Sequence, residues 1–138
     1  MMKALPVLLM TLLPLQARGQ EIQLTLNCQS ENVYDGQTKQ EGPSSESFSA
    51  IVRMSGSEDA SIEATTGFCP NYAGSFSELE VVATCYRAAV VGDSAYFAFL
   101  VINRVSGAFD LTNAGGPTRT ARRYTGHCTP GEKLPLAN

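Results

Sequence analysis

The chain is poor in the side chains on which most enzymes depend. It has no tryptophan and a single histidine, His127, in 138 residues. A serine or cysteine hydrolase needs a histidine base, and strand parity turns His127 towards solvent beside Cys128, which is expected in a disulfide. Neither a G-x-S-x-G nucleophile sequence nor a phosphate-binding G-K-S/T sequence is present. We therefore expect a protein without enzymatic activity.

Basic residues are also scarce. Without Lys3 and Arg18, which lie in a predicted leader, the ten Lys and Arg fall to eight against thirteen Asp and Glu, a net charge of −5. No cluster of basic residues interleaved with aromatics occurs, so nucleic acid is excluded as a partner.

Glu78 and Glu80 have the spacing that places two carboxylates on one strand face, as a glycosidase needs for its acid and base. Such sites usually also have aromatic residues that stack on the sugar, and none accompanies this pair. A solvated strand face is therefore the better interpretation.

No apolar run is long enough to cross a membrane. The longest, Ala4–Leu15, has twelve residues, whereas a transmembrane helix needs about 20. With Lys3 before it and Ala17-Arg18-Gly19 after it, this run predicts an export signal over residues 1–19. Residues 20–138 then form a single domain that is periplasmic or secreted and has no membrane span.

The four cysteines include no C-x-x-C pair, and an even number after an export signal predicts two disulfides. Cys28 and Cys128 end the apolar faces of the first and last expected strands, which favours a Cys28–Cys128 bond and a Cys69–Cys85 bond. The alternative joins Cys28 to Cys69 and Cys85 to Cys128. With one histidine in the chain, no metal site and no cofactor are expected.

No segment has helical periodicity over three turns, whereas short segments alternate between apolar and polar residues. This pattern predicts an all-β fold, a small antiparallel sandwich or barrel of about seven short strands held by disulfides. The expected strands are Glu21–Cys28, Ser47–Met54, Ala60–Ala64, Leu79–Tyr86, Tyr96–Asn103, 108–111 and Arg123–Cys128. The polar segments Gln29–Glu46, Thr65–Ser77 and Thr112–Arg122 are expected to be loops.

The strand Tyr96–Asn103 is apolar on both faces, which predicts burial on both faces. We expect a four-residue loop, capped by the Asn103 side chain and closed by Gly107 in the left-handed conformation, that sets Ile102 against Phe109. A two-residue turn at Ser106-Gly107 would instead set Arg104 against Phe109.

Two groups of side chains are candidate partner-binding residues. Three aromatics, Phe68, Tyr72 and Phe76, fall in the expected loop Thr65–Ser77, and three arginines, Arg119, Arg122 and Arg123, form a local basic group in an acidic chain.

The sequence Ile102-Asn103-Arg104-Val105-Ser106-Gly107, followed later by Gly126-His127-Cys128, resembles the C-terminal part of small exported bacterial proteins, mostly uncharacterised. Those proteins carry an I-D/N-R-x-x-G turn and then G-x-C, and this chain has Asn103 where Asp is common. The resemblance implies an exported β protein and no particular activity. We expect a binding or interaction protein of the cell envelope, with an unknown protein or envelope polymer as partner; the alternative is an inhibitor of a hydrolase such as lysozyme.

Overall fold

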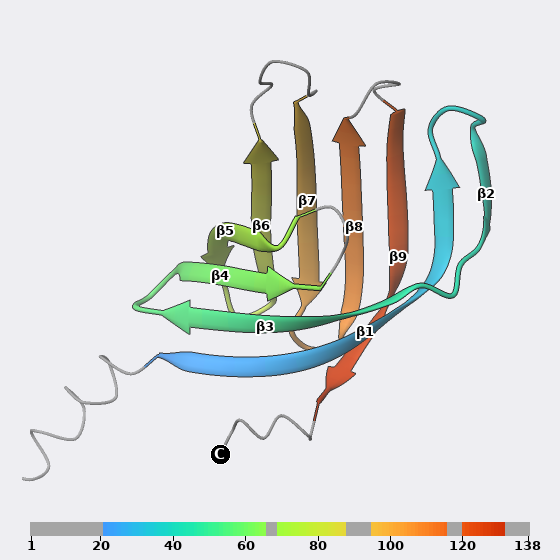
Figure 1. Cartoon of the computed structure of the whole chain (residues 1–138). Helices are drawn as coiled ribbons and strands as arrows, with labels where there is room; N and C mark the ends of the chain where they lie inside the picture. Colours follow the sequence, from blue (N-terminus) through green and yellow to red (C-terminus); the bar gives the residue numbers. More distant parts are fainter. Residues whose placement is uncertain (1–20, 66–68, 88–94, 116–119, 132–138) are drawn as a thin grey trace, which may run out of the picture.

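The computed structural model describes residues 21–65, 69–87, 95–115 and 120–131, and this part of the chain consists of strands and turns without a helix. All strands belong to one antiparallel sheet of nine, in the order β2-β1-β3-β4-β5-β6-β7-β8-β9, and β1 also pairs with β9. Eight strands thus form a closed barrel, and β2 extends the sheet outside it (Figure 1). The strands are β1 (Ile22–Asp35), β2 (Gln40–Pro43), β3 (Ser47–Ser55), β4 (Asp59–Ala64), β5 (Asn71–Phe76), β6 (Glu80–Arg87), β7 (Tyr96–Asn103), β8 (Ala108–Gly115) and β9 (Thr120–Pro130).

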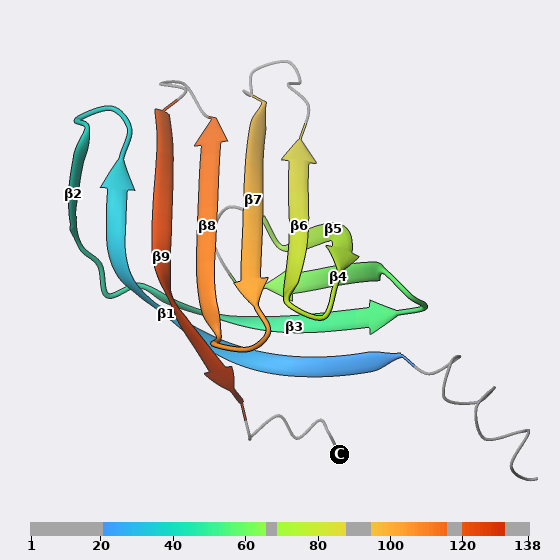
Figure 2. The same ribbon diagram turned by 180° about the vertical axis from the view of Figure 1, so that it is seen from behind.

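The long strand β1 joins two differently oriented parts of the barrel. Strands β6 to β9 lie side by side, and β3, β4 and the first half of β1 cross them steeply (Figures 1 and 2). The first half of β1 pairs with β3, with Ile22 opposite Met54, and its second half pairs with β2, with Asp35 opposite Gln40. On its other side β1 pairs with β9 from Leu26 to Asp35. The bend in β1 therefore turns one sheet into a closed barrel.

The predicted all-β, disulfide-bonded antiparallel fold is confirmed and takes the form of a barrel, not a sandwich, with nine described strands where about seven were expected. The loops were wrongly assigned in three places. The expected loop Gln29–Glu46 contains the second half of β1 and all of β2, and the expected loop Thr65–Ser77 contains β5. Strands β8 and β9 likewise extend into the expected loop Thr112–Arg122. Gly74 shows why glycine misled here: a Cβ at this position would collide with the Val82 carbonyl, so glycine permits close strand approach instead of ending the strand.

The core consists of residues at alternate strand positions that point into the barrel. Many of them are small, which lets opposite walls approach. The fully enclosed residues include Ala50, Val52, Met54, Ile62, Tyr72, Val81, Ala83, Ala98, Leu100, Ile102, Phe109, Leu111 and Tyr124.

Both disulfides favoured by the strand parities are formed. Cys28 lies directly opposite Cys128 in the β1–β9 register, with 3.9 Å between their Cα atoms. Cys69 forms a disulfide with Cys85, which links the segment before β5 to β6. The first bond therefore fastens the strand pair that closes the barrel.

The β7–β8 hairpin has the predicted register, with Ile102 opposite Phe109. The Asn103 Oδ1 atom accepts hydrogen bonds of 2.8 Å from the backbone N–H groups of Val105 and Ser106. Gly107 has φ +82°, and its carbonyl accepts a 2.7 Å hydrogen bond from the N–H of Cys128. The turn is thus attached to the strand that carries the closing disulfide.

Replacing Gly107 by valine should destabilise the barrel by about 2 kcal/mol or more, because a side chain in the left-handed region is strained. A Cβ at this position would also lie 2.5 Å from the carbonyl oxygen of Cys128. Gly42→Val is the matched control, since a Cβ there meets nothing within 4 Å. Urea unfolding measures both variants, and equal stabilities for the two would contradict the turn geometry.

The two disulfides should differ in their contribution to stability. The Cys28–Cys128 bond spans 100 residues and the Cys69–Cys85 bond spans 16, for which loop-closure entropy gives about 4.7 and about 3 kcal/mol. Replacing Cys28 and Cys128 by alanine should therefore lower the free energy of unfolding more than replacing Cys69 and Cys85. Denaturant titration of the two double variants without reductant tests the order, and the reverse order would show that β1–β9 closure is not the dominant constraint.

Candidate interaction site on the outer face of the barrel

Two of the three aromatics predicted to lie in a loop, Tyr72 and Phe76, pack against the barrel core. Tyr72 lies in β5, points into the barrel and is only 2% exposed, so its ring is not accessible to a partner. Phe76 packs against the core, and the Arg104 guanidinium lies 5.5 Å from its ring centre. Phe68 lies outside the described residues. Tyr72 was misplaced because its segment was taken for a loop instead of a strand with an inward face.

The predicted arginine group is divided between two sides of the sheet. Arg122 and Arg123 are neighbours in β9, so their side chains point to opposite faces. Arg123 binds both carboxylate oxygens of Asp110, with Nε 2.9 and 3.0 Å away, and these hydrogen bonds raise the pKa of Arg123 above its usual value. Arg119 lies outside the described residues. The described arginines therefore do not form one basic surface.

Arg122 makes an ion pair of 3.5 Å with Asp35 at the end of β1. The pKa of Asp35 is lowered, chiefly by the hydrogen bond that its carboxylate accepts from the N–H of Gln37 and further by Arg122. This pair lies at the open end of the β1–β9 ladder and contributes little to stability, because both charges are solvated.

Strand β7 provides the surface that sequence analysis missed. Its inward residues Ala98, Leu100 and Ile102 are buried, but its outward residues Phe97 and Phe99 are 41% and 36% exposed. The prediction that this strand is buried on both faces is wrong, because no described element covers the outside of the barrel here. The apolar outer face of this strand is visible in the sequence, but it was interpreted as a buried face instead of an exposed one.

Neighbouring strands add apolar side chains on both sides of the exposed Thr84, which lies opposite Phe99. The Phe97 and Phe99 rings are stacked, with their centres 6.5 Å apart and 12° between their planes. Tyr86 of β6 lies opposite Phe97 and is 68% exposed, while Val82 lies opposite Val101. We call these five residues, Val82, Tyr86, Phe97, Phe99 and Val101, the aromatic face.

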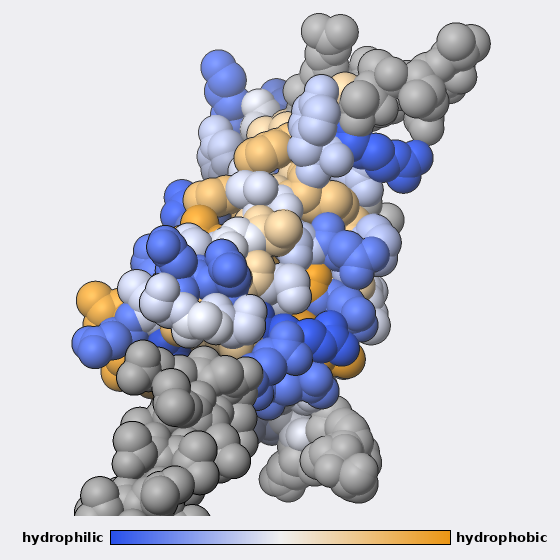
Figure 3. Space-filling model, turned by 90° about the vertical axis from the view of Figure 1, so that its left-hand side faces the viewer, coloured by the Kyte–Doolittle hydropathy of each residue, from blue (hydrophilic) through white to orange (hydrophobic). Residues whose placement is uncertain are grey.

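Polar groups border the aromatic face on the β8 side. Asp110 lies opposite Val101, and Thr112 lies opposite Phe99. Asp110 is already engaged by Arg123 of β9. Figure 3 views the side of the barrel where β4, β5 and β6 lie, and it shows hydrophobic residues exposed there among hydrophilic ones. The aromatic face can therefore bury apolar area, and Asp110, the charged residue beside it on β8, is already paired.

The side chains that could carry out catalysis or hold a metal are dispersed. His127 points outward and its Nδ1 lies 3.1 Å from Glu31 Oε2, with both side chains more than half exposed. Within the described ranges, no three His, Cys, Asp or Glu side chains lie close enough together to hold a metal ion. Likewise, the described residues include no helix with the length and apolar character to span a membrane.

Comparison with protein-family models, with curated proteins and with solved structures finds no match to this chain. The class of protein is therefore defined by its own structure, a closed antiparallel barrel with two disulfides and an exposed aromatic face.

Removing the two stacked rings should abolish binding of a hydrophobic dye to the native protein. The double variant Phe97→Ser, Phe99→Ser should lose most of the fluorescence enhancement of anilinonaphthalene sulfonate, because such dyes bind exposed apolar patches. Val105→Ser is the matched control, since Val105 is an exposed apolar residue on the β7–β8 turn, away from the face. A stronger loss in the Val105 variant would contradict the assignment of the aromatic face as the main apolar surface.

Proposed function

We propose that this chain is an exported, non-enzymatic interaction protein of the cell envelope and that its aromatic face binds a partner protein. The observation that carries the proposal is the exposure of Tyr86, Phe97 and Phe99 side by side on one sheet face. Exposed aromatic clusters are costly in water and are characteristic of the centres of protein interfaces. Complete burial of a large exposed apolar side chain contributes about 1.5 to 3 kcal/mol, and a partner that covers these rings gains the share that corresponds to their exposed area.

The chemistry of the aromatic face favours a protein over a sugar polymer. Phe97 and Phe99 carry no polar atoms, and the adjacent Asp110 is held by Arg123. The other polar groups beside the rings are the single hydroxyls of Thr84, Tyr86 and Thr112. A sugar needs several hydrogen-bonding groups that converge on its hydroxyls, whereas this face is mainly apolar. An apolar surface with a polar border is what a protein partner requires. The acidic excess of the chain further favours a partner with a basic surface around the contact.

A role without catalysis is supported by the surroundings of the single histidine. His127 faces outward against Glu31, and its neighbour Cys128 is in a disulfide, as is every other cysteine. The two disulfides are compatible with an oxidising compartment. Together with the predicted export signal over residues 1–19, they support a periplasmic or secreted location.

The second candidate function is inhibition of a hydrolase such as lysozyme, which would be a particular case of the same interaction. The specific observation in its favour is the net charge of −5 for residues 20–138, since an acidic protein is attracted to a basic enzyme. A hydrolase activity assay in the presence of the protein distinguishes this case from other interactions.

Site-specific photo-crosslinking tests the proposed surface. With a benzoylphenylalanine at position 99, the exported protein should crosslink to a discrete partner in envelope extract, and unlabelled parent protein should compete. Competition should be lost with the Phe97→Ser, Phe99→Ser variant and retained with Arg122→Ala, because Arg122 lies on the other side of the sheet. Exposed substitutions shift stability by about 0.5 kcal/mol or less, and the half-exposed rings somewhat more, so melting curves establish that each variant is folded.

Two results would contradict the proposal. One is equal competition by the parent protein and the double serine variant. The other is a crosslink from position 105, on the β7–β8 turn, that is as strong as that from position 99.

A further inference from the structure

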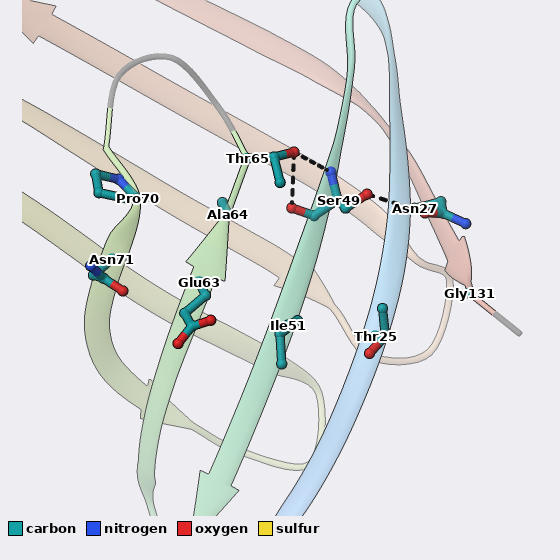
Figure 4. A pocket seen from close by; sticks show the side chains of 10 residues that line it. All are labelled: Thr25, Asn27, Ser49, Ile51, Glu63, Ala64, Thr65, Pro70, Asn71 and Gly131. Carbon is teal, nitrogen blue, oxygen red and sulfur yellow. Dashed lines mark hydrogen bonds between the residues drawn. The ribbon is translucent and has the colours of Figure 1, made fainter. Parts of the chain in front are cut away.

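A second surface of different chemistry lies across β1, β3, β4 and β5. It is an open depression of about 470 Å³ on the outside of the barrel (Figure 4). Its centre is apolar and its margin carries hydroxyl, amide and carboxylate groups. The residues that carry the argument are Thr25, Asn27, Ser49, Ile51, Glu63 and Asn71.

Strand register places one row of these side chains directly opposite one another. Thr25 of β1 is paired with Ile51 of β3, Ile51 with Glu63 of β4, and Glu63 with Asn71 of β5. Directly opposed residues on a sheet have their Cβ atoms about 5 Å apart. The row therefore presents hydroxyl, aliphatic, carboxylate and amide groups over about 15 Å, which is the length of a short oligosaccharide rather than of a single small ion.

A second row is organised by hydrogen bonds. The Thr65 hydroxyl accepts a 2.8 Å hydrogen bond from the N–H of Ser49, and the Ser49 hydroxyl donates to Asn27 Oδ1 at 3.4 Å (Figure 4). The carbonyl end of the Asn27 amide is thereby engaged, which leaves its NH₂ group as the donor available to a ligand. These hydrogen bonds therefore orient the side chains of this part of the depression in the absence of a ligand.

The Glu63 carboxylate is also oriented. Arg53 of β3 donates to its Oε2 at 3.1 Å, so Oε1 can accept from a ligand hydroxyl. The pair is neutral overall, and among the described residues Glu63 is the one charged residue that lines the depression. The described lining thus offers a carboxylate and no cationic group, and the neighbouring Arg53 is already paired with Glu63, which disfavours a phosphate, sulfate or uronic acid.

We propose that this depression binds a neutral sugar ring, alone or as a unit of an envelope glycan. Glu63, Asn71 and Asn27 would hydrogen-bond ring hydroxyls, and Ile51 would pack against the apolar C–H face of the ring. The aromatic face is mainly apolar, with the Tyr86 and Thr84 hydroxyls as its polar groups, whereas amide and carboxylate groups converge in the depression, so the two surfaces suit different ligands. This inference is independent of the proposed protein partner.

The test is a titration of the ¹⁵N-labelled protein, followed by two-dimensional NMR, with two neutral probes, cellotriose and triacetylchitotriose, and one anionic comparator, trigalacturonate. At least one neutral probe should give saturable shifts at the amides of Ile51, Glu63 and Asn71, and the comparator should bind more weakly. Glu63→Gln should weaken the binding about tenfold or more, because a hydrogen bond to a charged group is lost. Glu80→Gln, an exposed change on β6, should have no effect.

Three outcomes would overturn the inference: no saturable shifts with either neutral probe, saturable shifts centred on Phe97 and Phe99, or unchanged affinity in both Glu63→Gln and Asn71→Ala. The NMR spectrum of each variant shows directly that it is folded. Glucose as a further titrant distinguishes a free sugar from a unit of a glycan. A site for a glycan binds the trisaccharide more tightly than glucose, and a site for a free sugar does not. The photo-crosslinking from position 99 tests the protein partner separately, and its outcome does not depend on whether the depression binds a sugar.

Discussion

The pairing of β1 with β9 is the constraint on which the rest of the structure depends. Without it the chain would be an open meander with exposed edges at both β1 and β9. The Cys28–Cys128 bond lies inside this pairing and fixes its register, and Gly126 allows the two backbones to approach, since a Cβ there would collide with the Gln29 carbonyl. The β7–β8 turn is attached to the same place through the Gly107 carbonyl and the N–H of Cys128. Contacts between the two ends of the chain therefore organise the strands between them.

Closure of a small barrel also decides where function can reside. The interior is filled by inward residues such as Leu100, Ile62 and Met54, so the outer face and the barrel ends are the surfaces open to a partner. Two outer regions differ in chemistry: the aromatic face on β6 and β7, and the polar depression across β1, β3, β4 and β5. The first is suited to burial of apolar area and the second to directional hydrogen bonding, which supports separate ligands for the two regions.

The predictions succeeded where a local rule decides the outcome. Period-two alternation identified the β3–β4 hairpin, and the left-handed preference of glycine identified the turn at Gly107, which sets Ile102 against Phe109. The interpretation failed for β5, because glycine and proline near Tyr72 were taken as strand breakers. It also placed Tyr72 in a loop, whereas the ring is enclosed, since exposure of an aromatic ring depends on what covers it and not on its own segment.

The sequence by itself determined the fold class and the inward face of most strands, because alternation and turn residues are short-range properties of the chain. Strand parity favoured the observed cysteine pairing and left an alternative open, because it does not say which strands meet. Tertiary structure alone decided that Tyr72 is enclosed and that Phe97 and Phe99 are exposed. It also brought together Thr25, Ile51, Glu63 and Asn71 from four strands. Whether an apolar residue is buried or exposed depends on what packs against it. In a closed barrel the inward side chains pack against the opposite wall, whereas no described element covers the outward side chains of β7.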